Sequence, residues 1–354
     1  MASLGERLAE ARKAGHQLAR APERRKVAVA AFVDELAPAD RPSLFPDARS
    51  VAAFEDPIGT ITATRETAPG RQTVDVRVPA GLVLADAPAV DLIAAAIAAG
   101  DALALTGADD RLALARQALE TAGLPVQALL ALETGEGEEA GAHADRVIGG
   151  PSPSRDRTGA CHVFVDGAAD VDEALAVCRE ALTGEPQAVQ ADTVLVHEAL
   201  EGALLPALGE ALAETGIEPV AGEVARRRLS RARPAERATW LGRSGSRAVG
   251  VRVVGSVTEA LAHVHAHGSG RSEAIVTAEP SAAESFLLGA EAEHAVLNGP
   301  TTLGAQPRPP RDTVEPDAVD VEALTATRSL HLPAPEEAPA ATLAERLDRA
   351  LRPR

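Results

Sequence analysis

The chain has 354 residues, 45% of them hydrophobic, which is enough to bury a large core and predicts two domains. Fifty-two acidic residues against 35 basic ones give a formal net charge of −17, which argues against nucleic acid or an anionic membrane as a partner. We expect no transmembrane helix, because no run of about 18 uncharged apolar residues occurs.

Lysine is rare among the basic residues: only two of the 35 are lysines, Lys13 and Lys26, and the others are arginines. A GC-rich genome and a high-salt cytoplasm would each favour this acidic, lysine-poor composition, and the sequence leaves both open. The chain opens with charged, amphipathic sequence instead of a signal-peptide apolar region, so we expect a cytoplasmic protein. Two cysteines, Cys161 and Cys178, are too few for a disulfide framework or a cysteine-rich metal site.

The first half begins with two amphipathic helices and then alternates strands with helices. Apolar residues recur at three- and four-residue spacing over 4–18 and 23–36, and residues 73–79 alternate as a half-exposed strand does. Short apolar runs then predict further strands and longer periodic runs predict helices. The expected strands are 82–84, 102–105 and 127–132, and the expected helices are 89–99 and 111–122.

The second half repeats this alternation. Asp170 with Glu173, and Ser256 with Glu259, are helix-start signatures. Apolar runs and helical periodicity predict strands at 161–165, 193–196, 249–254, 274–276 and 295–297, and helices at 170–182, 199–214, 256–268 and 282–288. We expect the Pro-rich, acidic segment 299–339 to run over the surface and a last helix to span 343–351. The alternation indicates an α/β fold with parallel sheets covered by helices on both faces.

Several motifs occur in one order and spacing that resembles the gamma-glutamyl phosphate reductases of the aldehyde dehydrogenase superfamily. The stretch 159–166 reads Gly-Ala-Cys-His-Val-Phe-Val-Asp, like that family's Gly-x-Cys-His strand. The same order holds for His267-Gly-Ser, for Ser-Glu-Ala-Ile-Val-Thr at 272–277, for Ala-Val-Leu-Asn at 295–298 and for Val-Glu-Ala-Leu-Thr at 321–325. Each motif alone is weak, but five in register make the resemblance fairly specific over most of the chain.

The resemblance implies an aldehyde-dehydrogenase-like fold with two Rossmann-like α/β domains. It implies a cofactor-binding-type domain over 1–183, a catalytic-type domain over 184–300, and a C-terminal extension over 301–354 that returns to the first domain. The family reduces an acyl phosphate to glutamate semialdehyde with NADPH, through a thioester on cysteine, in proline synthesis. The resemblance also implies a homo-oligomer, or a hetero-oligomer with relatives of the same fold.

The family's cysteine nucleophile has no counterpart in this sequence. Aligned on the strand at 193–196, its position is occupied by Val189, or by Ala188 if the gap shifts by one residue. Neither side chain can form a thioester, so we assign no catalytic residue. Cys161 and Cys178 lie on an expected strand and on the apolar side of an expected helix, and we expect both to be buried structural thiols.

The other signatures that the resemblance assigns to the active site are also reduced. The family's polar stretch that holds substrate and oxyanion keeps only Pro88. Its lysine-bearing loop, which faces the cofactor's phosphate or ribose, is matched by Thr106, Gly107 and Asp109. An aspartate in place of a phosphate-facing lysine replaces attraction with repulsion. We therefore name these three residues as degenerate cofactor positions and leave the cofactor unknown, although the family uses NADP.

Three other groups of polar residues have an ordinary structural explanation. His263 and His267 share a helix face while His265 points away, so three metal ligands cannot converge from this helix alone, and we expect no metal site. His162 is expected to be a hydrogen-bonded strand histidine. The basic run 226–233 is expected to be a solvated face, and so are the acidic residues Glu133, Glu136, Glu138 and Glu139.

The leading hypothesis is therefore a catalytically degenerate paralogue with a non-catalytic or regulatory role. The alternatives are an NADP-dependent glutamate-5-semialdehyde dehydrogenase with an altered active site, and a small-ligand binding module that keeps the fold.

Overall fold

The computed structural model describes residues 2–68, 70–86, 89–107, 109–149, 159–185, 189–242, 247–305, 314–315, 319–333 and 345. The chain divides into two compact units, as its length predicts. Unit 1 comprises Met1–Ile58, Arg77–Arg155 and Pro309–Ala326, and unit 2 comprises Gly59–Val76, Asp156–Arg308 and Thr327–Arg354. No helix within the described ranges is both long and apolar enough to cross a membrane.

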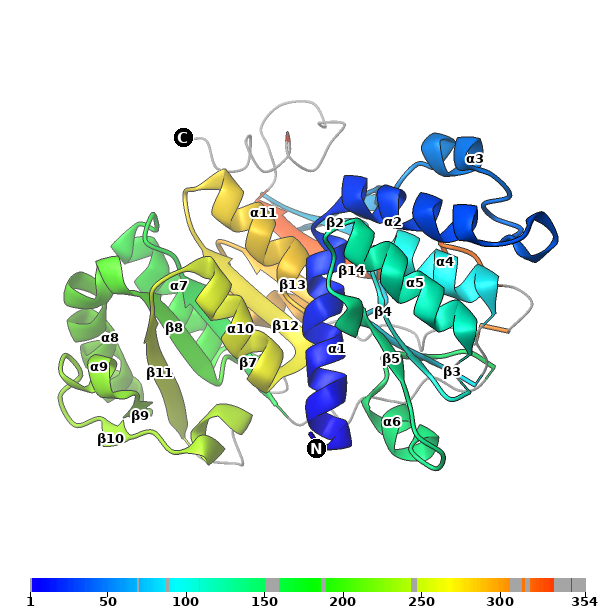
Figure 1. The fold of residues 1–354 in the computed structure, drawn as a ribbon. Helices are drawn as coiled ribbons and strands as arrows, with labels where there is room; N and C mark the ends of the chain where they lie inside the picture. The colour runs from blue at the N-terminus through cyan, green and yellow to red at the C-terminus, as the bar shows by residue number, and fades with distance from the viewer. Residues whose placement is uncertain are drawn as a thin grey trace. The chain divides into compact units, whose positions relative to one another are not determined.

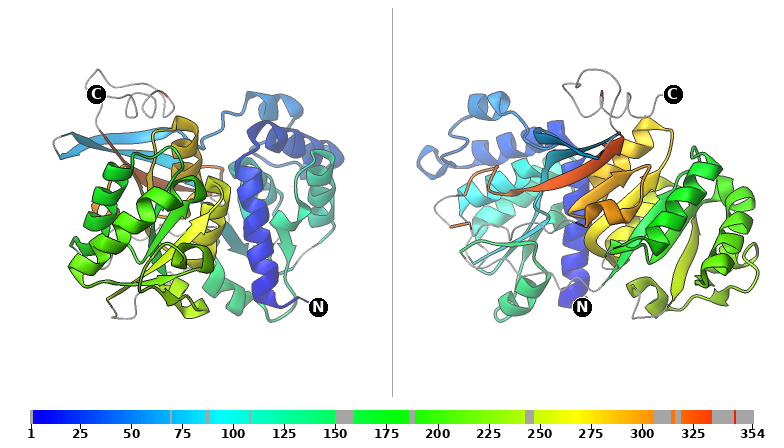
Figure 2. Two further views of the ribbon diagram at one scale, coloured as in Figure 1. Left: turned by 90° about the vertical axis from the view of Figure 1, so that its left-hand side faces the viewer. Right: turned by 180° about the vertical axis from the view of Figure 1, so that it is seen from behind.

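Unit 1 is built on a four-stranded parallel sheet in the order β5-β4-β3-β6. Its strands are β3 (Leu82–Ala85), β4 (Ala102–Leu105), β5 (Leu129–Ala131) and β6 (Arg146–Val147). Its helices are α1 (Leu4–Ala19), α2 (Pro22–Glu35), α3 (Ala48–Ala53), α4 (Val90–Ala99), α5 (Asp110–Thr121) and α6 (Gly137–His143). Figures 1 and 2 show α1 as a long helix that lies along this sheet.

Alternation along the strands divides unit 1 into layers. Leu82 and Leu84 pack with residues of α1 and α6 on one face of the sheet. Val83 and Leu103 pack with α2, α4 and α5 on the other. Because successive strand residues point to opposite faces, these short apolar strands contribute side chains to the hydrophobic clusters on both faces of the sheet. Helix α4 is buried on nearly all sides, which explains its run of Ala, Ile and Leu without a polar face.

Unit 2 holds most of a ten-stranded sheet in the order β1-β2-β14-β13-β12-β7-β8-β11-β9-β10. β1 (Ile61–Ala68) and β2 (Arg71–Pro79) form an antiparallel hairpin, and every pair with an assigned register from β14 to β10 is parallel. The other strands are β7 (Ala160–Val165), β8 (Thr193–His197), β9 (Glu218–Ala221), β10 (Arg233–Pro234), β11 (Ala248–Val254), β12 (Gly268–Val276), β13 (His294–Leu297) and β14 (Thr325–Pro333). In the view from behind in Figure 2, β1, β2 and β14 lie together at one edge.

Helices cover both faces of this sheet. α7 (Val171–Thr183) and α8 (Glu201–Thr215) pack on the face that carries Val163 and Val165. α10 (Val257–His267) and α11 (Pro280–Gly289) lie on the opposite face, where Phe164 stacks on Phe286 with ring centroids 5.8 Å apart. The short helix α9 (Glu223–Arg226) follows β9. β7 therefore presents His162 and Phe164 to α10 and α11, and this orientation builds the site described below.

Most expected elements are confirmed, and so is the α/β class with parallel sheets. Asp170 caps α7 by accepting from the Glu173 amide, and Ser256 caps α10 by accepting from the Glu259 amide. The expected boundary at residue 183 differs from the observed division, because β7 and α7 share the core of unit 2.

Two differences concern segments at the edge of the ten-stranded sheet. The prediction that 299–339 runs over the surface is wrong for 325–333, which form the buried strand β14. This strand was not predicted because several of its side chains are polar. These side chains are hydrogen-bonded in the interior, as when Arg328 donates to the carbonyls of Leu287 and Ala292. β1 was not expected, because its outward residues are polar and exposed. The expected helix at 343–351 lies outside the described residues except Glu345.

Candidate functional site

The position expected for a nucleophile carries a buried aliphatic side chain. Val189 lies in a short helical turn just before β8, with 6% of its surface exposed. The next residues anchor the turn, since the side-chain amide of Gln190 donates to the Gly184 carbonyl at 2.5 Å and the backbone amide of Ala191 donates to the Ala181 carbonyl at 2.8 Å. An isopropyl group offers no lone pair for attack on a carbonyl. The alternative position, Ala188, lies outside the described residues, as does Pro88.

Both cysteines are buried, as expected, and held in the neutral thiol form. Cys178 faces the core between α7 and α8, and burial raises its pKa to about 12. Burial, and secondly the nearby Glu273, raise the pKa of Cys161 to about 12. The Cys161 sulfur lies 3.5 Å from Ser269 Oγ, and its amide donates to Asp192 Oδ2 at 3.0 Å. Because the thiolate is the attacking species, neither sulfur is activated in this fold.

The same sheet carries a row of buried polar side chains, and the sequence did not predict that they lie side by side. Strand register places Glu273 of β12 beside His162 of β7, and His162 beside Thr193 of β8. All three are fully buried. Glu273 Oε2 accepts from the His162 amide and lies 2.9 Å from His162 Nδ1. His162 was expected to be a hydrogen-bonded strand residue, and this contact confirms it.

Aromatic rings from two other segments cover this row. The ring of His263 lies edge-on to those of His162 and Trp240, with centroids 5.3 and 5.1 Å apart. His267 lies one turn further along α10, and its ring centroid is 4.6 Å from that of His263. The rings pack against one another, and His263 Nδ1 lies 3.3 Å from a guanidinium nitrogen of Arg252.

The electrostatics of this cluster favour uncharged groups. Burial first, and then its histidine neighbours and Arg252, lower the pKa of His263 to about 2. Burial also lowers the pKa of His267 and raises that of Glu273. Several buried polar atoms here have no hydrogen-bond partner among the described residues: Nε2 of His162 and of His263, Nδ1 of His267, Oε1 of Glu273 and Oγ1 of Thr193. Burial therefore disfavours charge on His263, His267 and Glu273, and the cluster supplies no thiolate.

Metal ligation is not supported by the side chains that the structure describes, where no group of three or more His, Cys, Asp or Glu is placed to hold an ion. His265 points away from His263 and His267, as expected, and its Nε2 lies 2.8 Å from the Gly289 carbonyl oxygen.

The His162–Glu273 pair had one signal in the sequence. Each residue is a polar residue inside an otherwise apolar strand, as in Cys-His-Val-Phe-Val and Ser-Glu-Ala-Ile-Val.

The loop after β4 carries Thr106, Gly107 and Asp109, the three residues predicted to stand at degenerate cofactor positions. The Thr106 hydroxyl donates to the side chain of Asp86 at 3.0 Å, and Gly107 has a φ of +126° that favours glycine. Asp109 is the N-cap of α5 and accepts from the Arg111 amide at 2.9 Å. With Asp110 in the first turn, carboxylates occupy the end of the helix where a phosphate would otherwise be favoured.

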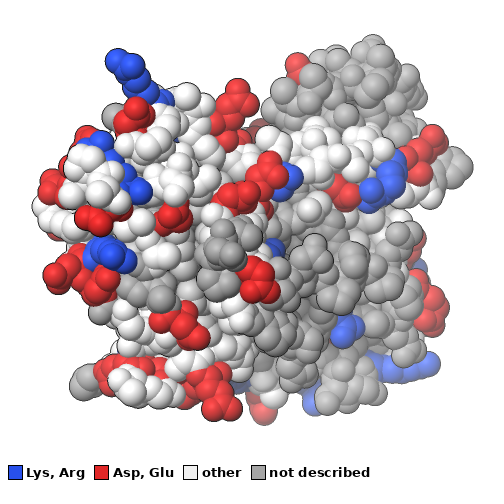
Figure 3. Space-filling model, turned by 90° about the vertical axis from the view of Figure 1, so that its right-hand side faces the viewer, with Lys and Arg blue, Asp and Glu red and all other residues white. Residues whose placement is uncertain are grey.

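The basic run 226–233 is largely paired with acidic neighbours, which agrees with a solvated face. Its ion pairs join Arg227 to Glu223, Arg228 to Glu201 and Arg233 to Glu218. Of the four glutamates expected to be solvated, Glu136 is an exception, because it is half-buried and pairs with Arg7 at 2.9 Å. On the described part of the face in Figure 3, acidic and basic side chains are interspersed.

Comparison with known proteins identifies relatives over most of the chain. It is 32% identical over 286 residues to the gamma-glutamyl phosphate reductase of Moorella thermoacetica, with 72% of this chain and 68% of the relative covered. It is 31% identical over 286 residues to the protein of that name from Thermus thermophilus, with 72% of this chain and 69% of the relative covered. No protein-family model matches the chain.

Two solved structures that the comparison matched to this chain carry the same name. The gamma-glutamyl phosphate reductase of Thermotoga maritima has 20% identity and a TM-score of 0.42, with 96% of this chain and 95% of that chain covered. The protein of Saccharomyces cerevisiae has 19% identity and a TM-score of 0.36, with 94% of this chain and 97% of that chain covered.

Proposed function

Because the chain belongs to the gamma-glutamyl phosphate reductase family and so has the aldehyde-dehydrogenase-like fold, we propose that it is a member without the family's cysteine nucleophile. We propose that it has a non-catalytic or regulatory role. The observation that carries this proposal is Val189, a buried aliphatic residue at the position expected for the attacking sulfur.

Two further features support the loss of the family's chemistry. Both thiols of the chain are buried with pKa values near 12, so the thiolate population at neutral pH is negligible. In addition, Asp109 and Asp110 at the start of α5 repel the phosphate groups that a dinucleotide would bring to this loop.

A folded protein stripped of its chemistry can still associate with its relatives. We propose that it forms homo-oligomers, or hetero-oligomers with cysteine-bearing members of the family, in the cytoplasm. Its action would then be to alter the activity of an intact reductase. Co-purification with such a reductase, followed by an activity measurement on the mixture, tests this part of the proposal.

The catalytic part of the proposal is tested with the purified full-length chain. Glutamate-5-semialdehyde, phosphate and NADP are supplied, and NADPH formation is followed by absorbance, with the gamma-glutamyl phosphate reductase of Thermus thermophilus as the positive control. We expect a rate equal to that without protein. A saturable rate that exceeds this background would overturn the proposal.

A second candidate is an altered dehydrogenase that uses Cys161. One observation favours it: Cys161 lies in β7 next to His162, and its sulfur lies near the hydroxyl of Ser269 in β12. The variants Cys161→Ala and Cys178→Ala separate the two candidates. Activity that disappears only in Cys161→Ala, while circular dichroism stays unchanged, would establish this second candidate.

A further inference from the structure

The chain contains one asparagine, Asn298, and a glycine follows it. Asn298 comes directly after β13, and Gly299 is buried. In an asparagine–glycine pair the side-chain amide can react with the backbone of its own chain, because glycine has no side chain that keeps its nitrogen away from the side-chain carbonyl carbon. The sequence therefore supplies a reactive amide, and the fold decides when it can react.

The side-chain amide of Asn298 is held by the segment that follows the neighbouring strand. Its Oδ1 accepts from the Thr277 amide at 2.9 Å, and its Nδ2 donates to the Thr277 carbonyl at 3.1 Å. The backbone amide of Asn298 donates to the Ile275 carbonyl at 2.9 Å. Its φ of +47° lies in the left-handed region, which asparagine tolerates better than most residues. The carboxyl ends of β12 and β13 are thus joined by three hydrogen bonds of one residue.

A guanidinium covers the residue whose nitrogen would attack. Arg71 of β2 donates to the Leu297 carbonyl at 2.8 Å and to the Asn298 carbonyl. A Cβ placed on Gly299 would lie 2.8 Å from Arg71 Nη2, so the guanidinium lies directly against this glycine. The backbone on both sides of the Asn298 side chain is therefore restrained by a residue from another strand.

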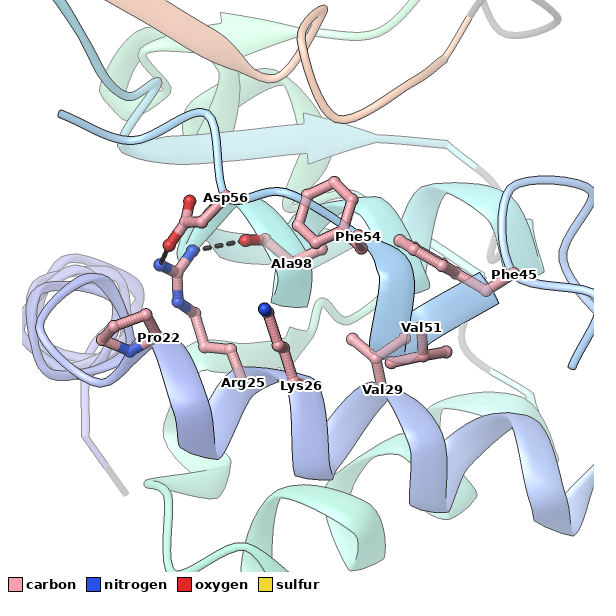
Figure 4. Close-up of a pocket in the computed structure, with 9 residues that line it drawn as sticks. All are labelled: Pro22, Arg25, Lys26, Val29, Phe45, Val51, Phe54, Asp56 and Ala98. Atoms are coloured by element: carbon pink, nitrogen blue, oxygen red, sulfur yellow. Dashed lines mark hydrogen bonds and ion pairs between the residues drawn. The ribbon is translucent and has the colours of Figure 1, made fainter. Parts of the chain in front are cut away.

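The position of Arg71 depends on these two carbonyls. A buried arginine of unit 1 also donates to a backbone carbonyl, since Arg25 donates to Ala98 near the end of α4, but it is fixed in addition by an ion pair with Asp56 (Figure 4). Among the described residues, Arg71 has no ion pair. Opening of the end of β13 therefore also releases the guanidinium that covers Gly299.

We propose that Asn298 is a deamidation site that reacts when the end of β13 opens. A solvent base removes the proton of the Gly299 amide, and the nitrogen attacks Cγ of Asn298. The N–Cγ bond forms, the Cγ–Nδ2 bond breaks, and ammonia leaves with a proton taken from water. Water then adds to one of the two carbonyls of the cyclic imide and leaves an aspartate or an isoaspartate at this position.

The native contacts oppose each of these steps. Gly299 is buried against Arg71, which keeps a solvent base from its amide proton. Attack makes Cγ tetrahedral and expels Nδ2, so both hydrogen bonds to Thr277 must break. Local opening of the strand end removes these obstacles together, and the rate should follow the population of the opened state.

The reaction should weaken the contact that restrained it. A carboxylate has no donor for the Thr277 carbonyl. Asp166 accepts from Thr277 Oγ1 at 2.8 Å and already places one negative charge beside this residue, which disfavours a second. An isoaspartate also adds a methylene to the backbone that Arg71 holds. Refolding does not restore the amide, so the site marks molecules that have opened here.

The first experiment compares the full-length protein in its native state and in urea, at the same mildly alkaline pH and temperature. Peptide mass spectrometry follows the segment that contains Asn298, and electron-transfer fragmentation distinguishes aspartate from isoaspartate. We expect both products in urea and a reaction at least about tenfold slower in the native protein. The absence of products in urea overturns the site, and equal rates in the two states overturn its control by the fold.

The second experiment tests the attack by the backbone nitrogen. Gly299→Ala is compared with the natural chain in urea, so the variant need not fold. We expect deamidation to be at least about tenfold slower, because the added methyl group hinders ring closure. Equal rates, or aspartate without isoaspartate, would show direct hydrolysis of the amide and overturn the cyclic route.

The third experiment tests the covering guanidinium. In Arg71→Ala we expect native deamidation to be faster by about threefold or more, with an unchanged rate in urea. Arg179→Ala, at an exposed position of α7, is the matched control and should react at the natural rate in both conditions. An unchanged native rate in Arg71→Ala with unaltered circular dichroism overturns the role of Arg71, and the first two experiments decide the proposal if this variant does not fold.

Discussion

Acidification should weaken the folded state through His263. This ring is 4% exposed and packs edge-on against His162 and Trp240. Burial lowers its pKa from 6.5 to about 2. The folded protein therefore keeps His263 neutral over a pH range in which the unfolded chain binds a proton.

The sign and size follow from this difference. Above pH 6.5 both states hold a neutral imidazole, and His263 makes no pH-dependent contribution. As the pH falls below 6.5, the unfolded state takes up the proton and the folded state does not, so stability is lost progressively toward the folded pKa of about 2. One proton corresponds to about 1.4 kcal/mol for each pH unit, or about 2 kcal/mol between pH 7 and pH 5.

Urea denaturation at a series of pH values between 7 and 5 measures this effect. Carboxylates titrate as well, so the quantity to compare is the difference between the natural chain and His263→Phe, which keeps a ring but cannot be protonated. We expect the variant to lose about 2 kcal/mol less over this range. His143→Phe, at an exposed position of α6, should follow the natural profile. Parallel profiles for the natural chain and His263→Phe would refute the reasoning.

Three further outcomes are expected. Ellman's reagent should modify neither Cys161 nor Cys178 in the native protein and both in denaturant, because both thiols are buried; prompt reaction of one thiol under native conditions would contradict this. Gly81→Ala should lower the free energy of unfolding by about 2 kcal/mol or more in urea denaturation, because φ is +113° and a Cβ would overlap the carboxylate of Asp145. Asp109→Ala should cost about 1 kcal/mol through loss of the cap on α5, and a change within error would show that the cap contributes nothing.

The elements that the sequence predicted are those whose signal is local. Helix α7 follows from Asp170 and an apolar stripe, and β7 follows from a short run of β-branched and aromatic residues. Strand β14 escaped prediction because its buried arginine, serine and histidine look like surface residues until their partners are known. The two buried cysteines show both a property that the sequence gives directly and one that depends on the fold. Their number is read from the sequence, whereas their pKa values depend on the residues that surround them in the folded protein.

By itself the sequence determined the α/β class, the family motifs and the valine expected at the nucleophile position, because each depends on residues close together in the chain. Tertiary structure alone decided which polar groups meet. His162 and Glu273 are separated by 111 residues and become neighbours only through the register of two parallel strands. Contacts of this kind arise from chain closure and packing, which no local pattern of residues records.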